Sequence, residues 1–210
     1  MTLPVPEGWA EVASKAPLAA QVNVDLPAAR AWFAPCAVLI DEDFHWLDTY
    51  GVRTARAALL SIEPDGKSGS GVASFDLVTN KWFASQLDEI PLRSHLESDR
   101  TYGPLRGHSL SIPFGPTVEY VLTDRLAFAA VGDGLLARVV GKGGTVRGPV
   151  AAIDVQPPLL SPESWGAVRE LLDLGGGGRF VERLMWWREA HFSISTDGNA
   201  LVLAASGRRR

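Results

Sequence analysis

The segment from Thr117 to Val155, which decides the fold class, reads TVEYVLTDRLAFAAVGDGLLARVVGKGGTVRGPVAAIDV. Two short apolar runs, Leu126 to Val131 and Leu135 to Val140, are separated in it by Gly-Asp-Gly. An Asp-Gly pair between apolar runs is typical of a tight hairpin turn, because glycine accepts the positive φ that such a turn needs. The segment therefore predicts a β-hairpin. Further strands are expected on either side, at Val118 to Leu122 and Val146 to Val155.

Strand-like patterns continue outward from this segment in both directions. Arg53 to Ile62 and Val72 to Val78 are joined by a turn-rich loop, which predicts a second hairpin. A third is expected between Phe192 and Ala204, around a Thr-Asp-Gly-Asn turn. Helices are predicted in fewer places. Their expected ranges are Pro27 to Phe33, Lys81 to Leu87, a helix beginning at Ser161-Pro162, and Phe180 to Trp187.

Several hairpins, few helices and no regular alternation of strand and helix predict an α+β fold. We expect an antiparallel or mixed sheet built from hairpins, with a few helices packed mainly on one face. The length of 210 residues fits one domain, 1–210. Tyr102 to Pro116 is rich in proline and glycine, so it predicts an irregular connection and marks where a subdomain break would fall.

Composition narrows the classes of function. A net charge of −4 argues against nucleic-acid binding, which usually needs a basic face. No run of 18 apolar residues predicts a membrane span, and the first residues lack the pattern of a signal peptide. The single cysteine, Cys36, excludes an internal disulfide and suits a reducing compartment. We therefore expect a soluble cytoplasmic protein, without a cofactor, and nothing in the sequence supports a homo-oligomer.

One polar cluster could carry metal chemistry. Asp41, Asp43, His45 and Asp48 lie close together in the sequence DEDFHWLD. Asp41 and His45 share a face on either a strand or a helix, and carboxylate and imidazole groups are suitable ligands for zinc, manganese or iron. The spacing matches no established metal motif, so an exposed turn between a strand and a helix is the favoured interpretation.

Two glycine-containing motifs are weaker candidates. The sequence Gly107-His108-Ser109-Leu110-Ser111 resembles the G-x-S-x-G nucleophile elbow, but it lacks the final glycine and is soon followed by proline. An ordinary loop is therefore favoured there. Gly175 to Arg179 could bind an anion at a helix N-terminus, but a joint between two helices explains it better.

The sequence Met185-Trp186-Trp187-Arg188 contains the candidate protein interface. On a helix, neighbouring side chains point about 100° apart, so Trp186 and Trp187 could not both face one narrow core. Trp and Arg are frequent anchors of protein interfaces. Trp186, Trp187 and Arg188 are therefore predicted to contact a partner. The alternative is a wide apolar helix face beneath the sheet.

These observations favour a non-catalytic module that binds another protein, as an adaptor, an assembly subunit or an inhibitor of the immunity-protein type. The alternative is a small metal-dependent hydrolase that uses the Asp41 to Asp48 cluster. A small-molecule pocket between the sheet and the C-terminal helices is a third hypothesis, although no particular residue supports it.

Overall fold

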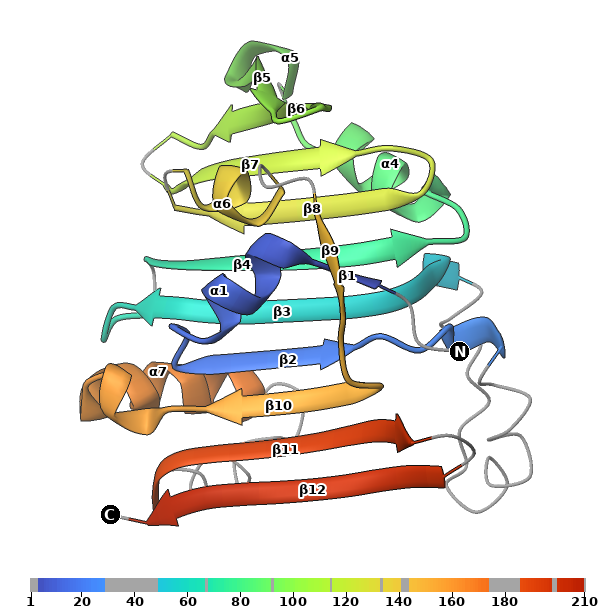
Figure 1. Cartoon of the computed structure of the whole chain (residues 1–210). Helices are drawn as coiled ribbons and strands as arrows, with labels where there is room; N and C mark the ends of the chain where they lie inside the picture. The colour runs from blue at the N-terminus through green and yellow to red at the C-terminus, as the bar shows by residue number, and fades with distance from the viewer. Residues whose placement is uncertain are drawn as a thin grey trace.

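The structure is a computed structural model that describes residues 4–28, 49–66, 68–91, 93–113, 115–132, 134–140, 144–173, 186–197 and 200–209. Within these residues a ten-stranded sheet dominates, in the order β12-β11-β10-β2-β3-β4-β8-β7-β6-β5 (Figure 1). Every neighbouring pair in it is antiparallel. The predicted α+β class with an antiparallel sheet is confirmed.

The strands differ widely in length. Those of the large sheet are β2 (Leu18–Val22), β3 (Val52–Ile62), β4 (Gly69–Leu77), β5 (Glu97–Tyr102), β6 (Leu105–Ser111), β7 (Thr117–Leu122), β8 (Leu126–Val131), β10 (Ala151–Val155), β11 (Trp187–Asp197) and β12 (Ala200–Arg209). A separate two-stranded sheet pairs β1 (Pro4–Pro6) with β9 (Thr145–Arg147). The predicted hairpins formed by β3 with β4 and by β11 with β12 are confirmed, and the second is longer than expected.

The helices are divided between the two faces of the sheet rather than gathered mainly on one (Figure 1). Those in the described part of the chain are α1 (Glu7–Ala13), α4 (Lys81–Asp88), α5 (Arg93–Leu96), α6 (Leu135–Val140) and α7 (Pro162–Asp173), together with a 3-10 turn, η1 (Pro157–Leu159). On one face, α1 and α6 bury a core that includes Trp9, Phe128 and Leu136. On the other face, α7 buries Trp165, and Phe83 of α4 packs on a separate small core.

The predicted hairpin between Leu126 and Val140 is wrong. The first apolar run forms β8, but the second forms the helix α6. Its buried residues are Leu135, Leu136, Val139 and Val140, and their spacing places them on one face of a helix. An apolar run of only six residues also fits a buried strand, so periodicity alone does not distinguish the two. The α6 backbone lies so close to α1 that a Cβ on Gly8 would come within 2.1 Å of the Arg138 carbonyl oxygen.

The irregular connection predicted from Tyr102 to Pro116 is also wrong in its first half. Residues Leu105–Ser111 form β6, which pairs with β5 on one side and with β7 on the other. Gly103 makes the tight turn between β5 and β6 with a φ of 57°. Gly107 lies inside β6, whereas the other glycine and proline residues that suggested a break lie outside it, and β6 itself continues the sheet.

Candidate protein interface

Two of the predicted site regions lie outside the described residues. Asp41, Asp43, His45 and Asp48 fall in the range 29–48, and Gly175 to Arg179 fall in the range 174–185. The metal-site and anion-site hypotheses therefore stay predictions. Among the residues that the structure does describe, no three His, Cys, Asp or Glu side chains gather as metal ligands.

The serine of the elbow-like motif lies in a strand. Ser109 is a buried residue in the middle of β6, which another strand follows. The strand-turn-helix geometry that exposes a nucleophile is not formed there. Asp154 lies on β10, which five other strands of the sheet separate from β6. Ser109 therefore does not occupy a nucleophile elbow.

The candidate interface residues lie at the start of β11 instead of on the predicted helix. Trp186 precedes the strand and is 77% exposed, and Arg188 is exposed as well. Trp187 is half-buried, and its ring lies against the next strand. A Cβ on Gly207 would come within 2.7 Å of that ring, and the Arg209 guanidinium lies 5.3 Å from its centroid. Trp187 therefore anchors the β11–β12 hairpin, whereas Trp186 is left facing solvent.

The strand β12 forms one edge of the sheet (Figure 1). It is ten residues long and pairs with β11 in an unbroken register from Ala200 to Arg208. Because it is the last strand in the order, every second residue turns its backbone N–H and C=O away from β11. Leu203, near its middle, is 79% exposed. This edge presents both backbone hydrogen-bonding groups and apolar surface.

The two faces of this end of the sheet differ in character. One has a shallow hollow of about 340 Å³, whose lining includes Ile153, Phe192 and Leu203. On the other face, Asp154, His191 and Ser206 lie opposite one another on β10, β11 and β12. Residues directly opposite each other in antiparallel strands share a face, so these three side chains form a polar row.

This polar row borders a cleft of about 400 Å³. The Asp154 carboxylate is 2.5 Å from Nδ1 of His191, and Arg208 is 3.5 Å from Glu189 beside them. The hydroxyl of Ser206 lies along the same cleft. A partner chain that lies along β12 would therefore meet apolar side chains on one face and hydrogen-bonding groups on the other.

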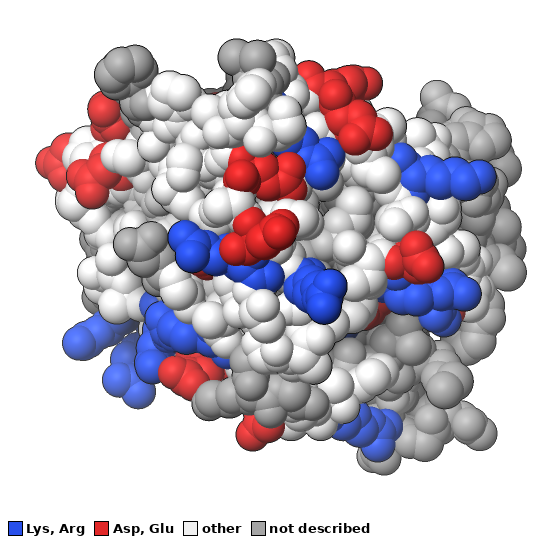
Figure 2. All heavy atoms as spheres, turned by 90° about the horizontal axis from the view of Figure 1, so that it is seen from above, with Lys and Arg blue, Asp and Glu red and all other residues white. Residues whose placement is uncertain are grey.

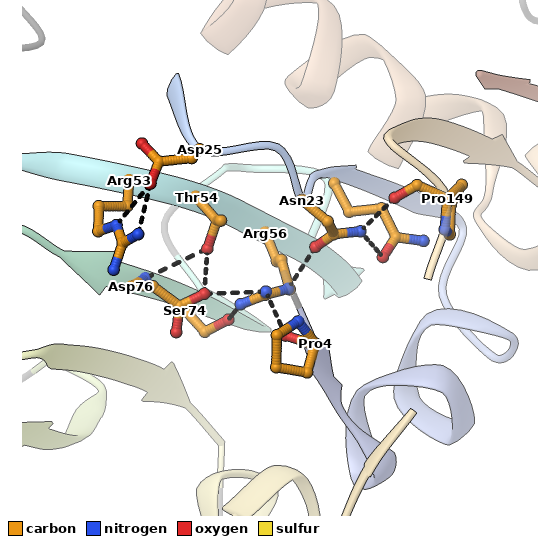
Figure 3. Close-up of polar contacts among 10 residues, drawn as sticks. Pro4, Asn23, Asp25, Arg53, Thr54, Arg56, Ser74, Asp76 and Pro149 are labelled. Atoms are coloured by element: carbon orange, nitrogen blue, oxygen red, sulfur yellow. Dashed lines mark hydrogen bonds and ion pairs between the residues drawn. The ribbon is translucent and has the colours of Figure 1, made fainter. Parts of the chain in front are cut away.

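A buried arginine lies in the middle of the sheet, on the face that α1 covers (Figure 3). Arg56 of β3 is 2% exposed. Its Nε donates to Oδ1 of Asn23 at 2.7 Å, and its Nη2 donates to Oδ2 of Asp76 at 3.0 Å and to the Pro4 carbonyl oxygen at 3.1 Å. The Thr54 hydroxyl donates to the same Asp76 carboxylate.

This network is structural. Its partners belong to β1, β3, β4 and the residue after β2, and Asn23 also donates to the Pro149 carbonyl oxygen at 3.0 Å. Burial lowers the pKa of Arg56, and the nearby Asp76 carboxylate partly offsets this effect. The guanidinium stays charged, as it does in proteins generally. The charge is therefore held by the chain itself and joins both sheets. We assign Arg56 to stability rather than to ligand binding.

Sequence reasoning missed the network, although a signal for it was present. Arg56 interrupts the apolar run of β3, and Asp76 lies in the second strand of the same predicted hairpin. A charge inside an apolar strand is seldom buried unless it is paired. The polar row of Asp154, His191 and Ser206 carried no such signal, because only the cross-strand register brings the three together.

None of the described helices is long and apolar enough to cross a membrane. No known protein family, curated protein or solved structure matches the chain.

Proposed function

We propose that this protein is a protein-binding module that receives an extended segment of a partner protein along β12. The observation that carries the proposal is the ten-residue edge strand, in which Leu203 is 79% exposed. Strand addition to an exposed edge is a common way to bind peptides, in which main-chain hydrogen bonds give affinity and alternate side chains give specificity.

Charge favours an acidic partner segment. Arg208 and Arg209 are exposed at the end of β12, and Arg188 is exposed at the start of β11. Among the described residues of that corner, Glu189 is the acidic residue near these three arginines. The corner is therefore positive, although the whole chain has a net charge of −4. Opposite charges on a partner would speed its approach and set the direction in which it lies.

Trp186 supplies the aromatic anchor in this proposal. It lies beside Trp187, whose ring is held by Gly207 and Arg209 at the positive end of β12. A partner strand beside β12 would reach this corner with its acidic residues, where it could cover the Trp186 ring. Exposed Trp and Arg side chains at such a corner are typical of the residues that carry most of the binding energy.

The proposal is tested by selecting extended peptides from a displayed library against the purified protein. We expect the selected peptides to alternate apolar and polar residues and to carry Asp or Glu at one end. Binding of a selected peptide should protect alternate amides of β12 from hydrogen exchange, and Trp186→Ala should weaken it about tenfold or more. Peptides that leave the β12 amides unprotected would contradict the proposal.

Self-pairing of β12 is the competing outcome. Two copies that pair through their β12 edges would form a dimer in sedimentation velocity, and Leu203→Asp would dissociate it. A stable dimer of that kind, with no peptide able to displace it, would replace the proposed partner with a second copy of the chain.

A further inference from the structure

A cleft of about 170 Å³ opens between α4 and the sheet, at the end of the sheet opposite to β12. The lining includes Phe75, Tyr120 and Ala129 from three strands, and Phe83, Gln86 and Leu87 from α4. The helix does not seal this part of the sheet, because none of its residues is fully buried. An apolar cavity of about 150 Å³ stays dry and accepts a molecule the size of benzene, so this cleft is large enough for one ring.

One wall of the cleft leads to a group of charged side chains. The Tyr120 hydroxyl donates a hydrogen bond to the carboxylate of Glu97 on β5. Burial and this carboxylate raise the pKa of Tyr120, so the hydroxyl stays protonated and remains the donor. The Nε of Arg93 donates to the other Glu97 oxygen at 2.7 Å. The Glu97 carboxylate therefore lies where the ring of Tyr120 ends.

His108 lies beside the same group. Its ring is tilted against the Tyr120 ring with the centroids 5.2 Å apart. Its Nδ1 is 2.9 Å from Glu97 and 3.2 Å from Asp99, and neither contact has the alignment of a hydrogen bond. The Asp99 side chain is 97% exposed, so its carboxylate is accessible from solvent.

The balance of charge in this group is negative. Among the described residues of this group, Glu97, Asp99 and Asp88 contribute three carboxylates. They face the guanidinium of Arg93, which contacts Asp88 at 3.2 Å, and the His108 ring. Burial alone would raise the pKa of Glu97, but hydrogen bonds from Tyr120 and Arg93 outweigh it, and the pKa lies below its usual value. Glu97 is therefore ionised at neutral pH, and the group as a whole attracts a cation.

We propose that this cleft binds a small amine with an aromatic or short alkyl body. The apolar body would lie against Phe75 and Phe83, whose rings contact each other with centroids 5.2 Å apart and form one wall of the cleft. The ammonium group would point past Tyr120 toward Glu97 and Asp99, where aromatic faces and carboxylates both favour a positive charge. An apolar pocket with a few convergent polar groups is the usual form of a small-molecule site.

Titration with three small aromatic probes that differ in charge tests the charge preference. Benzylamine, benzyl alcohol and benzoate are each titrated into the full chain at pH 7 and followed by two-dimensional amide NMR. We expect benzylamine to bind saturably, about tenfold or more tightly than benzyl alcohol, with benzoate weakest, and to shift the amides of α4 and β7. Equal binding of the three probes, or no binding of benzylamine, would overturn the proposal.

Two substitutions locate the site. Ala129 is an exposed residue that lines the cleft, so Ala129→Leu should fill it and weaken benzylamine tenfold or more, whereas Ala204→Leu on β12 is the matched control. Asp99→Asn should weaken benzylamine about threefold and leave benzyl alcohol unchanged, with Glu189→Gln as its control. Asp99→Asn keeps the test decisive if Ala129→Leu does not fold, because Asp99 makes little contact with the core. Wild-type affinity for benzylamine in Asp99→Asn, or in a folded Ala129→Leu variant, would place the amine elsewhere and overturn the proposal.

Discussion

The two edges of the large sheet differ in length, charge and cover. The β5 edge is six residues long, with Glu97, Asp99 and Arg100 in its sequence, and α5 lies directly before it. Viewed from this end, acidic and basic side chains are interspersed over the surface (Figure 2). The β12 edge is ten residues long, and its middle, from Leu201 to Ser206, carries no charge.

This difference indicates which edge is protected against other strands and which is open to them. Short, charged edge strands prevent unwanted pairing, whereas a long apolar edge is a template for another chain. The β12 edge therefore has the features of a binding edge, and the β5 edge those of a closed one. The comparison also separates the two proposed sites, because the cleft under α4 lies at the closed end.

The largest expected effect concerns the middle strands, which support both edges. Arg56→Ala should lower the free energy of unfolding by about 3 kcal/mol, because it leaves Asp76 and the buried Asn23 without their partner. Arg53→Ala is the matched control on the same strand. Its ion pair with Asp25 is partly exposed, so we expect a loss of about 1 kcal/mol or less. Urea denaturation measures both, and equal losses would contradict a structural role that is specific to Arg56.

The second effect should separate the two edges in binding. Leu203→Asp should weaken a selected acidic peptide about thirtyfold, which corresponds to about 2 kcal/mol, because it places a charge in the middle of the docking strand. The free energy of unfolding should change by less than about 0.5 kcal/mol, because Leu203 is largely exposed. Thr101→Asp on the β5 edge should leave peptide affinity unchanged. An equal loss in both variants, measured by calorimetry, would remove the distinction between the edges.

The third effect concerns the β5 edge and should leave the β12 edge unaffected. Glu97→Ala should lower the free energy of unfolding by about 1–2 kcal/mol, because Tyr120 and Arg93 lose a shared hydrogen-bond acceptor. Peptide binding at β12 should not change. Asp99→Ala, at a largely exposed position of the same strand, should cost less than about 0.5 kcal/mol. If the two substitutions cost the same, the β5 edge is not held by the Glu97 contacts.

The smallest effect is a dependence on pH that belongs to the β5 edge. The pKa of Glu97 is lower in the folded chain than its usual value. Its contribution to stability is therefore complete above the unfolded pKa and is lost as the pH falls through the folded pKa. Between pH 5 and pH 3, wild type should lose stability more steeply than Glu97→Gln in urea denaturation. Parallel pH profiles would show that Glu97 does not gain its charge contacts on folding.

Local pattern was sufficient wherever one element could be recognised from its own residues. The alternation of Arg53 to Ile62 and of Val72 to Val78 predicted β3 and β4, and Ser161-Pro162 marked the start of α7. Local pattern failed at Leu135 to Val140, because six apolar residues fit a buried strand and a helix face equally well. There the packing of α6 against α1 decides the outcome, and that contact joins distant parts of the chain.

The sequence by itself determined the class of fold, because the alternation of apolar residues and the turn residues act over a few positions along the chain. It also contained the aromatic and basic residues of the proposed interface. Only the tertiary structure decided that Trp187 begins a strand and that β12 is an edge. It alone assembled the Arg56 network and the cleft beside Tyr120. The physical reason is that strand order and register are set by contacts between distant segments, and these contacts determine which side chains meet and which backbone groups remain open.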